Sequence, residues 1–208
     1  IQSHTVNYTY AYQVNINTAS NIPIAPNSRA WMGSFQFVTA DARNLTSITL
    51  ENTKTGTVGT FDYNDIDSIL LYTSNSGTSN PLSNGGTRIA AVNWISGGTV
   101  GGRVTISGLN VATSITGTPN FLHVVYRWNT PVSGHKANAQ ITSSSNLTFN
   151  RIMSASTSFP ANFATDVNLP VEVLSFETKT VTKGVEIRLE TASEAETAQI
   201  IFIRKSDS

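Results

Sequence analysis

The sequence contains no cysteine, few charges and no long apolar run. Without cysteine there is no disulfide framework and no thiolate chemistry. Charged residues make up only 12% of the 208 residues and the formal net charge is zero, so no basic excess is present to bind nucleic acid or an anionic membrane. No apolar run approaches the ~20 residues of a membrane-spanning helix. We therefore expect neither a nucleic-acid partner nor a membrane span.

Signatures of catalysis are also missing. The sequence has no nucleophile elbow, P-loop or dinucleotide-binding glycine pattern. Its three histidines, His4, His123 and His135, lack the spacing of metal ligands. The acidic residues are scattered, so no carboxylate pair for glycoside hydrolysis is assigned. We therefore expect a protein that is not an enzyme.

The sequence is rich in short segments in which apolar and polar residues alternate. In HTVNYTYAYQVNI, residues 4–16, six apolar side chains occupy every second position: Val6, Tyr8, Tyr10, Tyr12, Val14 and Ile16. This period of two is typical of a β-strand with one buried face. Similar segments follow, separated by turns rich in glycine, asparagine and serine, and no convincing amphipathic helix is found. The pattern predicts an all-β protein, an antiparallel β-sandwich of immunoglobulin-like or jelly-roll-like type with a small C-terminal β extension.

The expected organisation has four parts. Residues 1–20 form an N-terminal strand, and residues 21–158 form the main sandwich. Residues 159–170 read as a linker. Residues 171–208 form a C-terminal β module that is partial or docked on something else, because about 38 residues do not normally bury enough apolar area to fold alone.

The C-terminal residues resemble a module found near the C-terminus of many secreted Bacteroidota proteins. The matching segments are LPVEVLSF (Leu169–Phe176), GVEIRL, TASE (Thr191–Glu194) and IFIRKS. The resemblance implies export, by the type IX route, to the cell surface or the medium. Two departures stand out: Leu189 occupies the place of a tryptophan, and Ile200 and Phe202 occupy places that are polar in the family. Since a strand that is apolar on both faces is normally covered on both, IIFI indicates extra burial, for instance by another subunit.

A second resemblance covers roughly residues 34–128. The order and spacing of its strand-like segments are similar to those of the β-sandwich domain that precedes the repeats of some bacterial sialidase-type proteins. The segments are SFQFVTADARNLTSITLENT, DIDSILLYTSNSGT, GRVTISGL and NFLHVVYRW. Such domains are accessory, so the resemblance implies no catalytic residue.

Two small ligand sites are worth testing. Asp62, Asn64, Asp65 and Asp67 supply clustered oxygens of the kind that Ca²⁺ prefers, although Asp and Asn equally cap turns by bonding nearby backbone amides, and the glycine and distal glutamate of an EF-hand are missing. Beyond that Ca²⁺ possibility no cofactor is expected. Trp94 lies beside a glycine-rich loop and is the best candidate for an exposed face on which a surface glycan would stack.

These features predict an extracellular, cell-surface protein with a structural or adhesive role. We expect copies of the chain to assemble into a filament by strand addition, in which an extended segment of one subunit completes a sheet of the next. The predicted interface residues are Val6, Tyr8, Tyr10, Tyr12, Val14, Ile16, Ile200 and Phe202. Two alternatives remain: the first strand pairs within its own sandwich, or the chain is a carbohydrate-binding accessory module of a secreted sialidase-type glycoside hydrolase.

Overall fold

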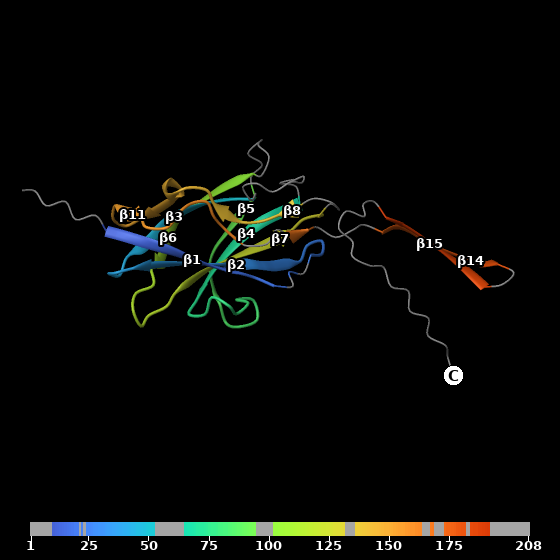
Figure 1. Ribbon diagram of the computed structural model, residues 1–208, viewed down its shortest axis with the longest axis horizontal. Coiled ribbons are helices and arrows are strands. Elements are labelled where there is room, and N and C mark those ends of the chain that lie inside the picture. Colours follow the sequence, from blue (N-terminus) through green and yellow to red (C-terminus); the bar gives the residue numbers. More distant parts are fainter. Residues whose placement is uncertain are drawn as a thin grey trace, which may run out of the picture.

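The computed structural model describes residues 10–20, 22, 24–52, 65–94, 102–131, 136–163, 167–168, 173–181 and 184–191. Apart from one turn of 3-10 helix at Ser144–Asn146, the regular elements of these residues are all β-strands. Two sheets pack face to face into a sandwich (Figure 1). The predicted all-β sandwich is therefore confirmed.

The first sheet has six strands in the order β11-β1-β2-β7-β4-β5. Its strands are β1 (Tyr10–Thr18), β2 (Arg29–Thr39), β4 (Ile66–Ser74), β5 (Thr87–Asn93), β7 (Phe121–Trp128) and β11 (Met153–Ala155). All neighbours are antiparallel except β1 and β11, which are parallel. The sequence predicts a purely antiparallel sandwich, so this one parallel pair is a difference.

The second sheet is built around β3 (Asn44–Glu51). β3 pairs with β6 (Arg103–Ala112), with β10 (Leu147–Phe149) and at one position with β9 (Gln140–Ile141), and β9 pairs with β12 (Ala161–Asn162). Two small pairs stand outside these sheets: β8 (Lys136–Ala137) with β13 (Val167–Asn168), and β14 (Val173–Val181) with β15 (Gly184–Thr191).

The core lies between the two sheets, and alternation along the strands explains its composition. In β7, Leu122, Val124, Tyr126 and Trp128 all belong to this core. Residues of the opposite face of β7 are also buried, because Val125 joins a second cluster with Trp31, Leu70, Tyr72 and Ala19. The loop after β4 contributes to this outer cover, since Ser34 Oγ donates to the carbonyl of Gly77 over 2.9 Å. Because β7 is a central strand buried on both faces, its sequence is nearly continuously apolar.

The predicted linker at 159–170 is wrong over its first five residues. β12 lies in this range and pairs with β9. Phe163 is 1% exposed and stacks on Phe35 with ring centroids 4.8 Å apart, and Phe159 packs against the same core. Proline and polar residues around these aromatics mimic a linker in the sequence, but the two phenylalanines hold the segment in the sandwich.

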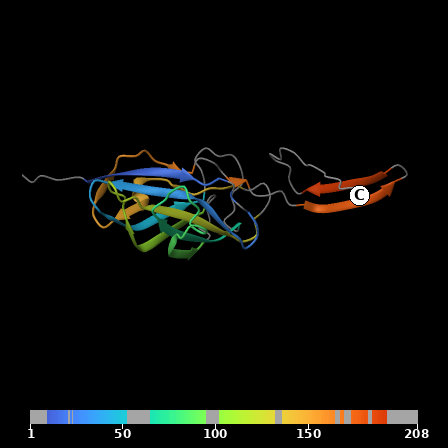
Figure 2. The same ribbon diagram turned by 90° about the horizontal axis from the view of Figure 1, so that it is seen from below.

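The C-terminal hairpin β14–β15 pairs only with itself among the described strands. Figures 1 and 2 both draw it beyond one end of the sandwich. Among the described residues, no helix is long and apolar enough to cross a membrane.

Candidate functional site

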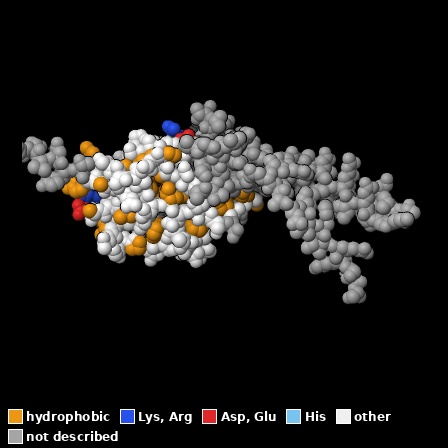
Figure 3. Space-filling view, in the orientation of Figure 1, with side chains coloured by type: hydrophobic (Ala, Val, Ile, Leu, Met, Phe, Trp, Pro, Cys, Tyr) orange, Lys and Arg blue, Asp and Glu red, His pale blue; other side chains and the backbone are white. Residues whose placement is uncertain are grey.

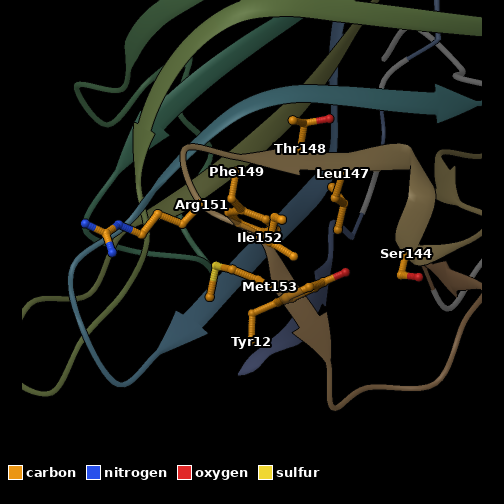
Figure 4. A pocket seen from close by; sticks show the side chains of 8 residues that line it. All are labelled: Tyr12, Ser144, Leu147, Thr148, Phe149, Arg151, Ile152 and Met153. Carbon is orange, nitrogen blue, oxygen red and sulfur yellow. The ribbon is translucent and has the colours of Figure 1, made fainter. Parts of the chain in front are cut away.

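A pocket of about 220 Å³ lies where edge strands of the two sheets meet. β1 and β11 of the first sheet and β10 of the second surround it, and the turn from β10 to β11 forms part of its rim (Figure 4). The four apolar residues of its lining are Leu147, Phe149, Ile152 and Met153. This volume is below the 300–1,000 Å³ of ordinary small-molecule sites, so it suits an occupant about the size of one side chain.

Tyr12 supplies the polar group of this pocket. The tyrosine is 2% exposed, and its ring packs against Phe149 with centroids 4.8 Å apart. Its hydroxyl is buried and has no hydrogen-bond partner. Burial raises the pKa of the Tyr12 phenol, so the hydroxyl keeps its proton at neutral pH. A buried hydroxyl normally finds a partner, because leaving it unpaired costs about 1–3 kcal/mol.

Ile152 stands at the mouth of the pocket. It is 93% exposed, whereas the other large apolar residues exposed in the described part of the chain, Leu82 and Ile89, are each 38% exposed. Ser144 and Arg151 add a hydroxyl and an exposed guanidinium to the rim (Figure 4). The pocket thus combines an apolar floor, one unpaired donor and an apolar side chain in solvent.

In this structure the central residues of the predicted N-terminal interface pair and pack within their own chain. β1 pairs with β2 from Tyr12–Thr39 to Thr18–Gly33. Tyr12 and Val14 are buried in the core, and Ile16 packs against it. Tyr10 is partly buried, with the Arg43 guanidinium 4.5 Å from its ring centroid. The strand therefore completes its own sheet, which corrects the interface prediction for Tyr12, Val14 and Ile16.

The other predicted interface residues, Val6, Tyr8, Ile200 and Phe202, lie outside the described residues.

Trp94 is not the exposed stacking face that the sequence predicts. It is 8% exposed and packs edge-on to Tyr126, with ring centroids 6.3 Å apart. Its ring also sits over Gly102, where an added Cβ would come within 2.7 Å of the indole. Trp31 and Trp128 are buried as well. The glycine-rich sequence beside Trp94 suggested exposure, but the absence of a side chain at Gly102 instead allows the backbone to cover the indole.

The predicted Ca²⁺ cluster is described only in part. Asp62 and Asn64 lie outside the described residues. Asp65 is buried, and its carbonyl accepts a hydrogen bond from Asn129 over 2.9 Å. Asp67 accepts from Ser68 and forms an ion pair with Arg127, whose Nη1 is 3.4 Å from its Oδ2. No three acidic or histidine side chains gather in the described part of the chain. Asp67 therefore has structural partners of its own.

The pocket is not evident from the sequence because its residues are distant in the chain. Tyr12 and the segment 144–153 meet through the parallel pairing of β1 with β11 and the contact of Tyr12 with Phe149, and no periodicity in the sequence predicts either. One local signal existed: Ile152 follows Asn150 and Arg151 in a polar turn, where an apolar residue lacks an evident core to join. No protein-family model matches the chain, and no curated protein matches it significantly.

Proposed function

We propose that this is a non-catalytic, extracellular structural or adhesive protein whose copies assemble by strand addition. The observation that supports the proposal is the amphipathic C-terminal hairpin. Its register pairs Phe176 with Leu189, Thr178 with Ile187 and Thr180 with Val185. Residues opposite each other share a face, so one face of the hairpin carries the apolar positions.

The other face of the hairpin carries charges of both signs. Glu177 is opposite Arg188, and Lys179 is opposite Glu186. Opposite charges across a strand pair suit a face that stays in water. This contrast between the positions of the two faces supports a hairpin that covers another surface with one face only.

A two-stranded hairpin is at best marginally stable alone in water. The host that covers its apolar face is, in this proposal, a neighbouring copy of the chain. A hairpin that adds to a surface elsewhere on the next copy makes a head-to-tail contact, and a head-to-tail contact that does not close generates a filament. Main-chain hydrogen bonds at the sheet edge supply affinity, and the alternate side chains supply specificity.

The localisation rests on two sequence observations. Hydroxyl and amide residues replace charged ones on the outward faces of strands, as in many extracellular β-proteins, and the last 40 residues resemble an export module of secreted Bacteroidota proteins. Both support a role outside the cell, on the surface or in the medium.

The experiment compares two variants that place glutamate on opposite faces of β15. Ile187→Glu charges the apolar face, and Arg188→Glu changes the charged face at the next position. We expect the unmodified chain and Arg188→Glu to form filaments in negative-stain images, and Ile187→Glu to remain monomeric in sedimentation velocity. Single particles only for the unmodified chain, or filaments from both variants, would contradict the proposal.

A further inference from the structure

The outer strands of the two sheets differ in how well they suit an added strand. β5 and β6 are long outer strands, but each contains a bulge: β5 has an extra residue where its register with β4 shifts between Leu71 and Tyr72, and β6 has extra residues where its register with β3 shifts between Leu45 and Ser47. Bulges bend an edge and interrupt its ladder, which protects natural edges against pairing. β11 runs in regular register with β1 from Met153 to Ala155.

β11 is only three residues long, so its main-chain ladder alone gives little affinity. The pocket beside β11 offers further contacts that would strengthen the binding of an added strand. It holds about 220 Å³ of space, an apolar floor, and the unpaired hydroxyl of the buried Tyr12. A strand docking there gains from one inserted side chain and from covering Ile152, as in other cases of strand addition where pockets take alternate side chains.

We infer that the pocket between β1, β10 and β11 is the acceptor site for an apolar side chain from the β14–β15 hairpin of a second copy. This inference rests on the proposed function and names its docking site. The hairpin is the occupant that fits, because apolar residues recur at every second position of its register and its two outer edges are free of described partners.

The placement of the elements favours a second copy over the same one. β13, which ends a few residues before the hairpin, and its partner β8 lie at one end of the sandwich, and β11 lies towards the other (Figure 1). The space-filling view shows the described surface to be mostly neutral, with charged side chains at only a few places on this face, one of them the left end of the sandwich (Figure 3). Donor and acceptor at opposite ends produce the head-to-tail geometry of an open assembly.

The first test uses a matched pair of substitutions at exposed isoleucines. Ile152→Gln removes apolar surface at the pocket mouth, and Ile89→Gln makes the same change on β5. Burying an isoleucine is worth about a tenfold change in affinity or more. We therefore expect Ile152→Gln to raise the concentration needed for assembly at least tenfold in sedimentation velocity, while Ile89→Gln behaves like the unmodified chain.

The outcomes separate this inference from the proposed function. If Ile89→Gln weakens assembly and Ile152→Gln does not, copies assemble through β5 and the pocket is not the acceptor. If neither substitution matters but the unmodified chain assembles, the acceptor lies elsewhere and the inference is again overturned. An unmodified chain that stays monomeric would overturn both.

A second test removes only the Tyr12 hydroxyl. Because that hydroxyl is unpaired in the single chain, Tyr12→Phe is expected to leave the melting temperature unchanged or higher. In the assembly a main-chain carbonyl of the incoming strand accepts from the hydroxyl, because an apolar side chain cannot, so the same variant should assemble about fivefold more weakly. A variant that melts lower and assembles normally would show that Tyr12 already has a partner within its own chain.

A third test identifies the occupant by cross-linking, which a chain without cysteine makes clean. Ile152→Cys is mixed in separate experiments with size-tagged Ile187→Cys and with size-tagged Tyr8→Cys. We expect an oxidised mixed dimer with the Ile187→Cys chain. A mixed dimer with Tyr8→Cys alone would assign the pocket to the N-terminal segment of the neighbour, and no mixed dimer with either would reject docking at this mouth.

Discussion

At the scale of single residues, the burial of His123 makes the stability of the fold depend on pH. It is fully buried on the outer face of β7, with Nε2 2.7 Å from Ser74 Oγ. The Ser74 hydroxyl donates to the Ser76 carbonyl over 2.8 Å, so Nε2 of His123 carries the proton and donates to Ser74. Nδ1 is buried without a partner. Burial lowers the pKa of His123 to about 4, against a backbone hydrogen bond at Ser76 that acts in the opposite direction.

This lowered pKa predicts a pH-dependent stability. Above the unfolded pKa of about 6.5 both states hold a neutral imidazole. As the pH falls from about 6.5 to about 4, the unfolded state takes up a proton that the folded state does not, and the free energy of unfolding drops. The full loss is at most about 3 kcal/mol.

Urea denaturation of the unmodified chain and of His123→Gln between pH 7 and pH 4 measures this effect. Glutamine keeps a donor for Ser74 but does not titrate, so the variant should lose less stability over that interval. The comparison cancels every contribution to the pH dependence that the two proteins share. Equal loss in the two proteins would show that His123 is not the group responsible.

At the scale of elements, the bulge in β2 depends on one glycine. The register between β2 and β7 shifts between Trp31 and Gly33, and Gly33 has φ of 153°. A Cβ there would meet the Asn17 carbonyl oxygen at 2.5 Å and the Phe163 ring at 2.6 Å. Gly117, with φ of 79°, has open space instead.

We expect Gly33→Ala to lower the free energy of unfolding by more than about 3 kcal/mol, because both backbone and a packed ring must move. Gly117→Ala should cost only about 1–2 kcal/mol, since the left-handed conformation alone is strained. Thermal denaturation of the two variants checks the difference. Equal costs would mean that the bulge can relax around a methyl group.

The segment around Phe163 gives a second prediction at this scale. Phe163 stacks on Phe35 and is fully buried. Phe163→Ala should cost about 3–5 kcal/mol, as for other buried phenylalanines. If residues 159–163 were a linker, the same substitution would leave the midpoint of urea unfolding unchanged.

The elements show what sequence patterns determine and what they leave open. Alternation correctly predicts β1, with Tyr12 and Val14 on its buried face, because the period of two is a local property. It does not reveal which strand lies beside β1, because pairing with Met153–Ala155 depends on contacts more than 140 residues away along the chain. Trp94 and Phe163 were misread for the same reason: their cover comes from Gly102 and Phe35, which no local window contains.

At the scale of the whole molecule, the two ends of the chain differ in how they relate to the sandwich. β1 supplies Tyr12 and Val14 to the core and pairs along seven positions with β2. The hairpin at the other end pairs with no other described strand.

Truncation separates these roles. Removing residues 1–9 leaves β1 intact, so we expect the melting temperature to equal that of the full chain. Removing residues 1–15 deletes Tyr12 and Val14, and the loss of two core side chains, at roughly 2–5 kcal/mol each, approaches the whole stability of such a domain. We expect the longer truncation to lose its cooperative unfolding transition by circular dichroism. A folded product would show that β1 is dispensable to its own sheet.

Assembly through the hairpin requires that a neighbouring copy cover its apolar face. Hydrogen exchange of the β15 amides, residues 184–191, followed by mass spectrometry in concentrated and dilute samples, measures that cover directly. We expect slow exchange in the concentrated sample and much faster exchange after dilution, while β7 stays protected in both. Exchange of β15 that is equally slow at both concentrations would place its cover within the same chain and contradict assembly through the hairpin.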